Sequence, residues 1–136
     1  MNDQQTTIAE IKKRVNEYRQ ARGWKDEDPK DIAIGLVLEA AEVLELVQWR
    51  EGEELKENAR LRGMVADELA DVLWWVVVMV QRLGLDLARA FEIKVDKQEK
   101  KYPAEIFGDP SLSEEEKRKI YYKIKAQYRG KNPIEE

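Results

Sequence analysis

The chain has 136 residues, 43% of them hydrophobic and 38% charged, and its formal net charge is −4. This length allows one domain with a real core, and a net acidic chain lacks the basic footprint of a general nucleic-acid binder. The absence of Cys and His excludes disulfides and Ser-His-Asp catalysis and disfavours zinc, which leaves carboxylates, Lys, Tyr and hard metal ions for chemistry.

Hydrophobic spacing along the chain predicts an all-α protein. Gly23 and Trp24 begin a loop after the first helix, and Pro29 or Lys30 opens the second. Residues 53–63 are polar and fit a loop, a short helix, or an early part of the third helix interrupted at Gly63. Residues 104–112 are expected to be a loop, followed by a capping box of Ser113 and Glu116, and Gly130 ends the last helix. The predicted helices are 5–22, 29–49, 64–83, 87–101 and 114–129.

The second and third predicted helices carry pairs of acids without nearby bases. Glu39 and Glu42 are three residues apart, as are Glu68 and Asp71, so each pair lies on one helix face. The second pair is followed by nine apolar residues, 72–80, and a helix that is apolar all round is expected to be buried all round.

If these two helices pack together, four carboxylates converge. Their mutual repulsion then requires protonation or cations, and hard divalent cations prefer oxygen ligands. The alternative is an ordinary solvated face, because charged helices contain many pairs at this spacing.

The two acidic pairs, Glu39-Ala-Ala-Glu42 and Glu68-Leu-Ala-Asp71, resemble the signature of the MazG-like nucleoside triphosphate pyrophosphohydrolases. The 25 residues between Glu42 and Glu68 suit that signature. Four further motifs extend the resemblance: Gly23-Trp24, Val47-Gln48-Trp49, Lys94-Val-Asp96-x-Gln98 and Lys101-Tyr102-Pro103. The resemblance is closest to the dCTP pyrophosphatase branch of the family and spans about residues 10–103.

The resemblance implies Mg²⁺-dependent hydrolysis of a nucleoside triphosphate to the monophosphate and pyrophosphate, with Mn²⁺ as the alternative metal. It assigns metal binding and catalysis to Glu39, Glu42, Glu68 and Asp71, without deciding which carboxylate is the general base. It also implies a MazG-like helical bundle completed by a homodimer or homotetramer.

The resemblance further implies substrate-binding residues, and pyrimidine deoxynucleotides such as dCTP or dUTP are the expected substrates. Two departures from the family pattern concern this substrate. Trp75 stands where the family often has Tyr, and Gln98 stands where it often has Asn. The candidate substrate contacts are Trp24, Trp49, Trp75, Lys94, Gln98 and Tyr102.

Residues 1–110 are expected to form the MazG-like domain and residues 111–136 a C-terminal helical extension. With no signal peptide visible and no apolar run long enough to span a bilayer, a cytoplasmic protein with neither membrane nor nucleic-acid partners is expected. Two other functions remain open: a phosphoribosyl-ATP pyrophosphohydrolase-like enzyme, disfavoured by the Trp24 and Trp49 matches, and a non-catalytic helical interaction module, which would need no metal.

Overall fold

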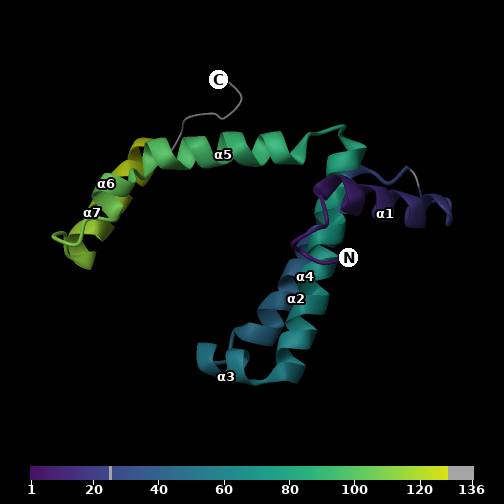
Figure 1. Ribbon diagram of the computed structural model, residues 1–136, viewed down its shortest axis with the longest axis horizontal. Coiled ribbons are helices and arrows are strands. Elements are labelled where there is room, and N and C mark those ends of the chain that lie inside the picture. Colours follow the sequence, from purple (N-terminus) through teal and green to yellow (C-terminus); the bar gives the residue numbers. More distant parts are fainter. Residues whose placement is uncertain (25, 129–136) are drawn as a thin grey trace. The chain divides into compact units, whose positions relative to one another are not determined.

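The computed structural model describes residues 1–24 and 26–128. Those residues form α-helices and turns without any strand, so the all-α prediction is confirmed (Figure 1). None of the described helices is both long enough and apolar enough to cross a bilayer. The helices are α1 (Ile8–Gln20), α2 (Pro29–Val47), α3 (Gly52–Glu57), α4 (Ala59–Arg82), α5 (Leu87–Lys101), α6 (Ala104–Phe107) and α7 (Glu114–Tyr128).

The chain divides into two compact units, Met1–Leu87 and Ala88–Glu136. The predicted domain boundary after residue 110 differs from this division into units, and it stays a prediction.

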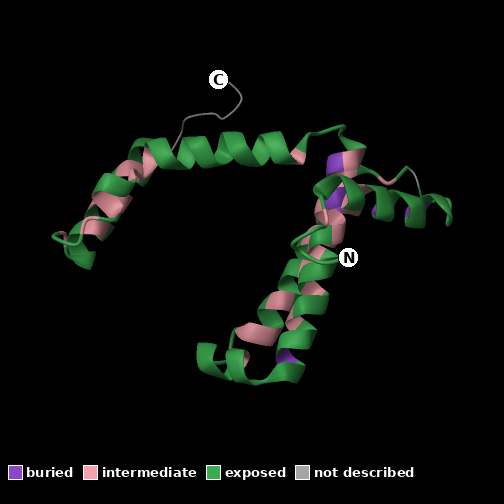
Figure 2. Ribbon diagram, viewed as in Figure 1, coloured by how far each residue is buried: buried purple, intermediate pink, exposed green. Residues whose placement is uncertain are grey.

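In the first unit, α2 and α4 lie side by side and α3 connects them at one end (Figure 1). α1 packs against α4 as well. The buried cluster between these helices consists of Val15 of α1, Ile32 of α2, and Val77 and Val78 of α4. Val77 and Val78 are at most 1% exposed. Figure 2 shows buried residues on α1 and α4 near their crossing. The core therefore fixes the second half of α4 against the other two helices.

Side-chain caps decide where the helices begin. The Asp28 carboxylate accepts from the Lys30 N–H at 2.8 Å, with Pro29 in the first turn of α2. The Asn58 side chain accepts from the Leu61 N–H at 3.0 Å and starts α4. Such caps satisfy backbone donors that the first turn of a helix leaves free.

The start of the third predicted helix and the predicted loop 104–112 need correction, and the alternatives left open for residues 53–63 are decided. α4 begins at Ala59, five residues earlier than predicted, and passes through Gly63 without interruption, because the Asn58 cap offsets the roughly 1 kcal/mol cost of a helical glycine. The polar stretch before it contains the short helix α3. The predicted loop 104–112 contains α6, which starts after Pro103. Gly130, the predicted end of the last helix, lies outside the described residues.

The prediction that residues 72–80 are buried all round was wrong for the single chain. Val77, Val78 and Val80 are buried, but Leu73 is 42% exposed and the remaining members of the run are half-buried. Among the described residues of the first unit, α1, α2 and α3 contact α4, and these contacts leave Leu73 exposed.

The second unit is held by aromatic contacts. Tyr102 stacks on Tyr121 with ring centroids 5.4 Å apart, and Phe107 meets Tyr102 edge-on at 5.5 Å. The predicted capping box is present at the start of α7, where the Ser113 N–H donates to the Glu116 carboxylate at 2.8 Å. These contacts join α6 and α7 to the end of α5.

Candidate metal-binding site

Three carboxylates from α2 and α4 converge at the candidate metal-binding site. One carboxylate oxygen from each of Glu39, Glu42 and Glu68 lies within 4.8 Å of the others. Glu39 and Glu42 share a face of α2, and Glu68 faces them from α4. Asp71, one turn along α4 from Glu68, is outside this set. The structure thus brings together three of the four acids that the sequence singles out.

The cluster carries an excess of negative charge. Glu68 is half-buried, and its loss of hydration is the main reason that its pKa is raised above the ordinary glutamate value. The charges of Glu42, Asp71 and Glu39 raise this pKa further, in that order of influence, as does a hydrogen bond with Glu42. Asp71 therefore acts on the cluster electrostatically.

Within residues 1–24 and 26–128, no recorded ion pair involves any of these four carboxylates. The donor set suits a hard cation, because carboxylate oxygens are the ligands that Mg²⁺, Mn²⁺ and Ca²⁺ prefer. Two oxygens on opposite sides of such an ion lie about 4–5 Å apart. The three side chains therefore fit one divalent cation with small rotations, and that cation would neutralise the repulsion.

Trp75, which the sequence analysis expected as a substrate contact, and Gly35, which it had not singled out, form one side of the cluster. The Trp75 indole N–H donates to Glu39 Oε1 at 3.3 Å. A Cβ atom placed on Gly35 would lie 2.7–2.9 Å from three atoms of the indole ring, so this glycine gives the ring its space. The available signal was a glycine inside an apolar helical stretch, which points to a close packing contact.

The predicted substrate residue Trp24 lies in the loop between α1 and α2. α1 ends in a Schellman motif, with Gly23 at a φ of 71°. The Gly23 N–H donates to the Gln20 carbonyl, and the Trp24 N–H donates to the Arg19 carbonyl. The Trp24 ring meets Tyr18 edge-on at 6.2 Å, and Tyr18 in turn meets Trp74 of α4 at 5.1 Å. A chain of aromatic rings thus links this loop to α4, one turn from Asp71.

A buried ion pair holds the same loop. Arg19 is only 7% exposed and forms an ion pair with Glu27. The backbone carbonyl of Glu27 accepts a hydrogen bond from Arg82 Nε at 3.0 Å. An arginine this well buried requires such a partner. Both ends of the loop are therefore tied to helices.

The remaining predicted substrate residues occupy different positions. Trp49 follows the C-terminal end of α2 and is 87% exposed. Lys94 and Gln98 are exposed on α5 in the second unit. Tyr102 is half-buried by its stack on Tyr121, so its ring serves the packing of that unit.

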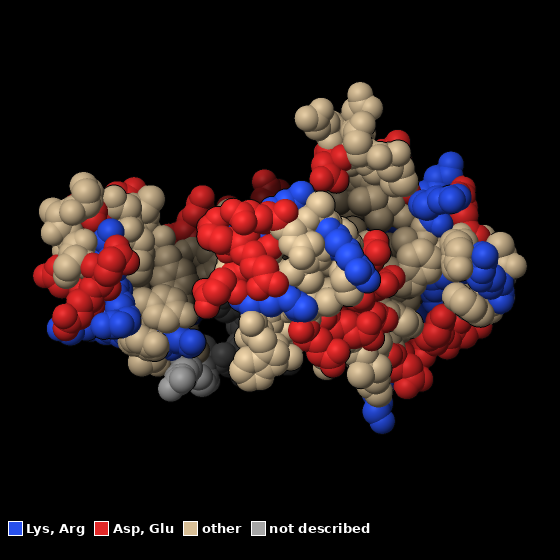
Figure 3. Space-filling view, turned by 90° about the horizontal axis from the view of Figure 1, so that it is seen from below, with Lys and Arg blue, Asp and Glu red and all other residues tan. Residues whose placement is uncertain are grey.

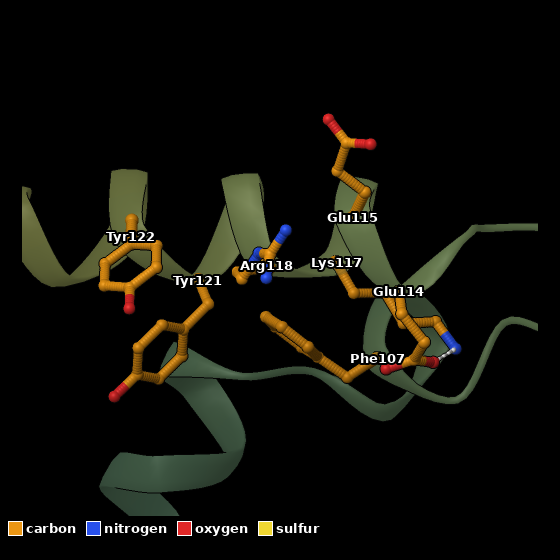
Figure 4. A pocket seen from close by; sticks show the side chains of 7 residues that line it. All are labelled: Phe107, Glu114, Glu115, Lys117, Arg118, Tyr121 and Tyr122. Atoms are coloured by element: carbon orange, nitrogen blue, oxygen red, sulfur yellow. Dashed lines mark ion pairs between the residues drawn. The ribbon is translucent and has the colours of Figure 1, made fainter.

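The second unit contains a hollow of about 580 Å³ that differs chemically from the carboxylate cluster (Figure 4). One of its acids, Glu114, is paired with Lys117 at 3.6 Å, so the hollow offers no comparable excess of negative charge. The hollow is lined by Phe107, Glu114, Glu115, Lys117, Arg118, Tyr121 and Tyr122.

On the face shown in Figure 3, acidic and basic side chains are interspersed, and the basic ones form no continuous stripe. This distribution offers no basic footprint on that face.

The MazG-like family matches residues 34–110, which include all four acids. The chain is similar to dCTP pyrophosphatase 1 of Bos taurus, with 31% identity over 104 residues that cover 74% of this chain and 62% of the relative. The Homo sapiens dCTP pyrophosphatase 1 is 32% identical over 104 residues and is covered to 61%. The chain thus spans about three fifths of the length of these curated relatives.

A solved structure of a pyrophosphatase from Archaeoglobus fulgidus is also similar, with a TM-score of 0.65 and 31% sequence identity. The alignment covers 76% of this chain and 98% of that structure. The likeness therefore extends to the fold, and it covers nearly all of that protein.

The repulsion at Glu68 predicts a stabilising substitution in the metal-free protein. A carboxyl whose pKa is raised by folding contributes stability that is fully present below its unfolded pKa of about 4.3 and is lost as pH rises through the folded pKa. Glu42→Gln removes one cause of the raised pKa, so it should raise the Tm at pH 7.5 in EDTA, with a much smaller effect at pH 4.

The matched control is Glu45→Gln, an identical change on an exposed α2 residue outside the cluster. The control should leave the Tm nearly unchanged at both pH values. An unchanged or lower Tm for Glu42→Gln at pH 7.5 would contradict the repulsion.

Proposed function

Because the chain belongs to the MazG-like family, we propose that it is a divalent-metal-dependent pyrophosphohydrolase of nucleoside triphosphates. The observation that carries the proposal is the convergence of Glu39, Glu42 and Glu68, none of which forms an ion pair with a Lys or Arg of the described residues. The names of the similar proteins, dCTP pyrophosphatase 1 and a pyrophosphatase, support the same chemistry. The proposed role is cytoplasmic house-cleaning of the nucleotide pool.

In the proposed reaction, water attacks the triphosphate, the link between the α- and β-phosphates breaks, and the monophosphate and pyrophosphate leave. A bound Mg²⁺ or Mn²⁺ would neutralise phosphate oxygens and orient the attacking water. Glu39, Glu42 and Glu68 would hold the metal, with Asp71 completing the acidic set. One of the four carboxylates takes the proton from water, and a group with a raised pKa suits that role.

The two helices supply rigidity for this site. Side chains on packed helices keep their relative positions better than side chains on loops. The mutual packing of α2 and α4, the most extensive helix contact in the described chain, therefore keeps the carboxylates together before any metal binds.

Loss of a metal ligand should abolish turnover without unfolding the protein. Glu42→Gln and Asp71→Asn should each lower kcat by about a hundred-fold or more, because each removes negative charge that holds the cation, and the cation stabilises the transition state. The measurement is pyrophosphate release from dCTP with Mg²⁺, with circular dichroism to confirm folding. Glu45→Gln is the control and should keep its turnover. Wild-type turnover in both variants at the site would refute the mechanism.

The apolar face of α2 supports an oligomer. Val37 is 67% exposed, Leu38 58% and Leu44 55%, and Ile34, Val37 and Leu38 line an apolar hollow of about 330 Å³. Exposed apolar patches of this kind mark interaction surfaces. We propose a homodimer or homotetramer in which this face is covered by a second copy.

Light scattering at micromolar concentration should therefore give at least twice the chain mass of 15.9 kDa. Val37→Glu should shift the population toward the monomer, because a buried unpaired charge is costly. Ile8→Glu, a change of the same chemistry on α1, should leave the assembly intact. A wild-type monomer would exclude this role of the face.

Substrate preference is proposed from the aromatic residues and the two departures from the family pattern. Trp24 and Trp49 can stack on any base, so discrimination depends on polar groups such as the Gln98 amide. Trp75 is bulkier than the tyrosine of the family. Hydrogen-bond donors at the base edge discriminate strongly, because a mismatched base leaves them unpaired. Lys94 and Tyr102 remain proposed phosphate contacts.

We expect higher kcat/KM for dCTP or dUTP than for dATP or CTP. The measurement is initial rates for dCTP, dUTP, dTTP, dATP and CTP at saturating Mg²⁺. A preference for dATP or CTP would reject the proposed substrate preference while leaving the metal chemistry in place.

A further inference from the structure

The contact between Trp75, Gly35 and Glu39 carries a further inference about the metal-binding site. Gly35 and Glu39 are four residues apart on α2 and share one face of that helix. Trp75 reaches that face from α4, with its ring against Gly35 and its N–H on Glu39 Oε1 at 3.3 Å. One side chain of α4 therefore contacts both the backbone of α2 and an acid of the cluster.

We propose that Trp75 is a positioning residue that orients the Glu39 carboxylate for a divalent cation, and that Gly35 is the space this positioning requires. This inference rests on the proposed metal site and names a further residue within it. The indole nitrogen is a donor only, so it can hold a carboxylate without competing for the metal. One oxygen of Glu39 accepts the indole N–H, and the other stays available as a ligand.

The fixed position of the indole makes this hydrogen bond effective. A free glutamate side chain loses considerable rotamer freedom when it binds a metal, and a donor held in place removes part of that loss beforehand. Trp75 is half-buried, and the Gly35 backbone bounds its ring on one side. The polar edge of the ring is therefore committed to Glu39, and only the exposed part of the ring can meet a substrate.

The first test is metal binding in the absence of nucleotide. Isothermal titration of Mg²⁺, and of Mn²⁺, into the full chain should give about ten-fold weaker binding for Trp75→Phe than for wild type, within the 10–100-fold effect typical of residues that orient metal ligands. The substitution keeps an aromatic ring and removes the donor. Equal affinity in Trp75→Phe and wild type would overturn the inference.

Trp74→Phe is the matched control. Trp74 is the preceding residue on the same helix, also half-buried, and its ring packs edge-on against Tyr18 at 5.1 Å. This variant should bind Mg²⁺ with wild-type affinity, and an equal loss in both variants would show that only general packing is involved.

Gly35→Ala provides a second route that leaves the indole in the sequence. The added Cβ would lie 2.7 Å from the indole Cε2, so the ring must shift and Mg²⁺ binding should weaken. If the glycine acts through the ring, Gly35→Ala should have little further effect on affinity once Trp75→Phe is present, whereas additive losses would overturn this link.

A spectroscopic readout distinguishes positioning from packing. In ¹⁵N spectra, the indole N–H signal that disappears in Trp75→Phe should shift when Mg²⁺ is added to the wild type. Absence of that shift in a protein that binds Mg²⁺ would count against the inference. A wild type that binds neither Mg²⁺ nor Mn²⁺ would instead refute the proposed function itself.

Discussion

The packing of α2 against α4 is the interaction on which the rest of the site depends, because it brings acids together that repel each other. Glu39, Glu42 and Glu68 meet within 4.8 Å, and loss of hydration together with the neighbouring negative charges raises the pKa of Glu68. Apolar burial between the same helices, centred on Ile32 and Val78, supplies the opposing free energy. The protein therefore keeps together a cluster of negative charge that a bound cation would stabilise.

A second set of contacts fixes the loop between α1 and α2. The loop that carries Trp24 is held by the Arg19–Glu27 ion pair, by Arg82, and by the ring of Tyr18. A buried pair of charges adds little net stability but fixes geometry when both partners are satisfied. The loop thus holds the Trp24 ring at a defined place, which the base stacking that we propose for this residue would require.

The apolar surface that stays exposed bears on the assembly. Val37 and Leu38 on α2, Leu73 on α4, and Phe91 on α5 are all more than 40% exposed. A small chain has few helices with which to cover such surfaces, and a second copy supplies further ones. The oligomer that we propose would complete the helical bundle by covering the same helices that carry the acids.

The sequence by itself determined the all-α class, the positions of most helices and the two acidic pairs, because helical periodicity, caps and charge spacing are local properties. It also indicated the convergence of the acids, since neither pair has a neighbouring base. Only the tertiary structure decided that Asp71 lies outside the set of three converging oxygens and that α4 runs through Gly63. It also decided that the Trp75 ring packs against Gly35 and donates a hydrogen bond to Glu39. The positions of Asp71 and Trp75 depend on the register between α2 and α4, and register is set by how side chains distant in sequence pack together. The continuation of α4 through Gly63 rests instead on the Asn58 cap.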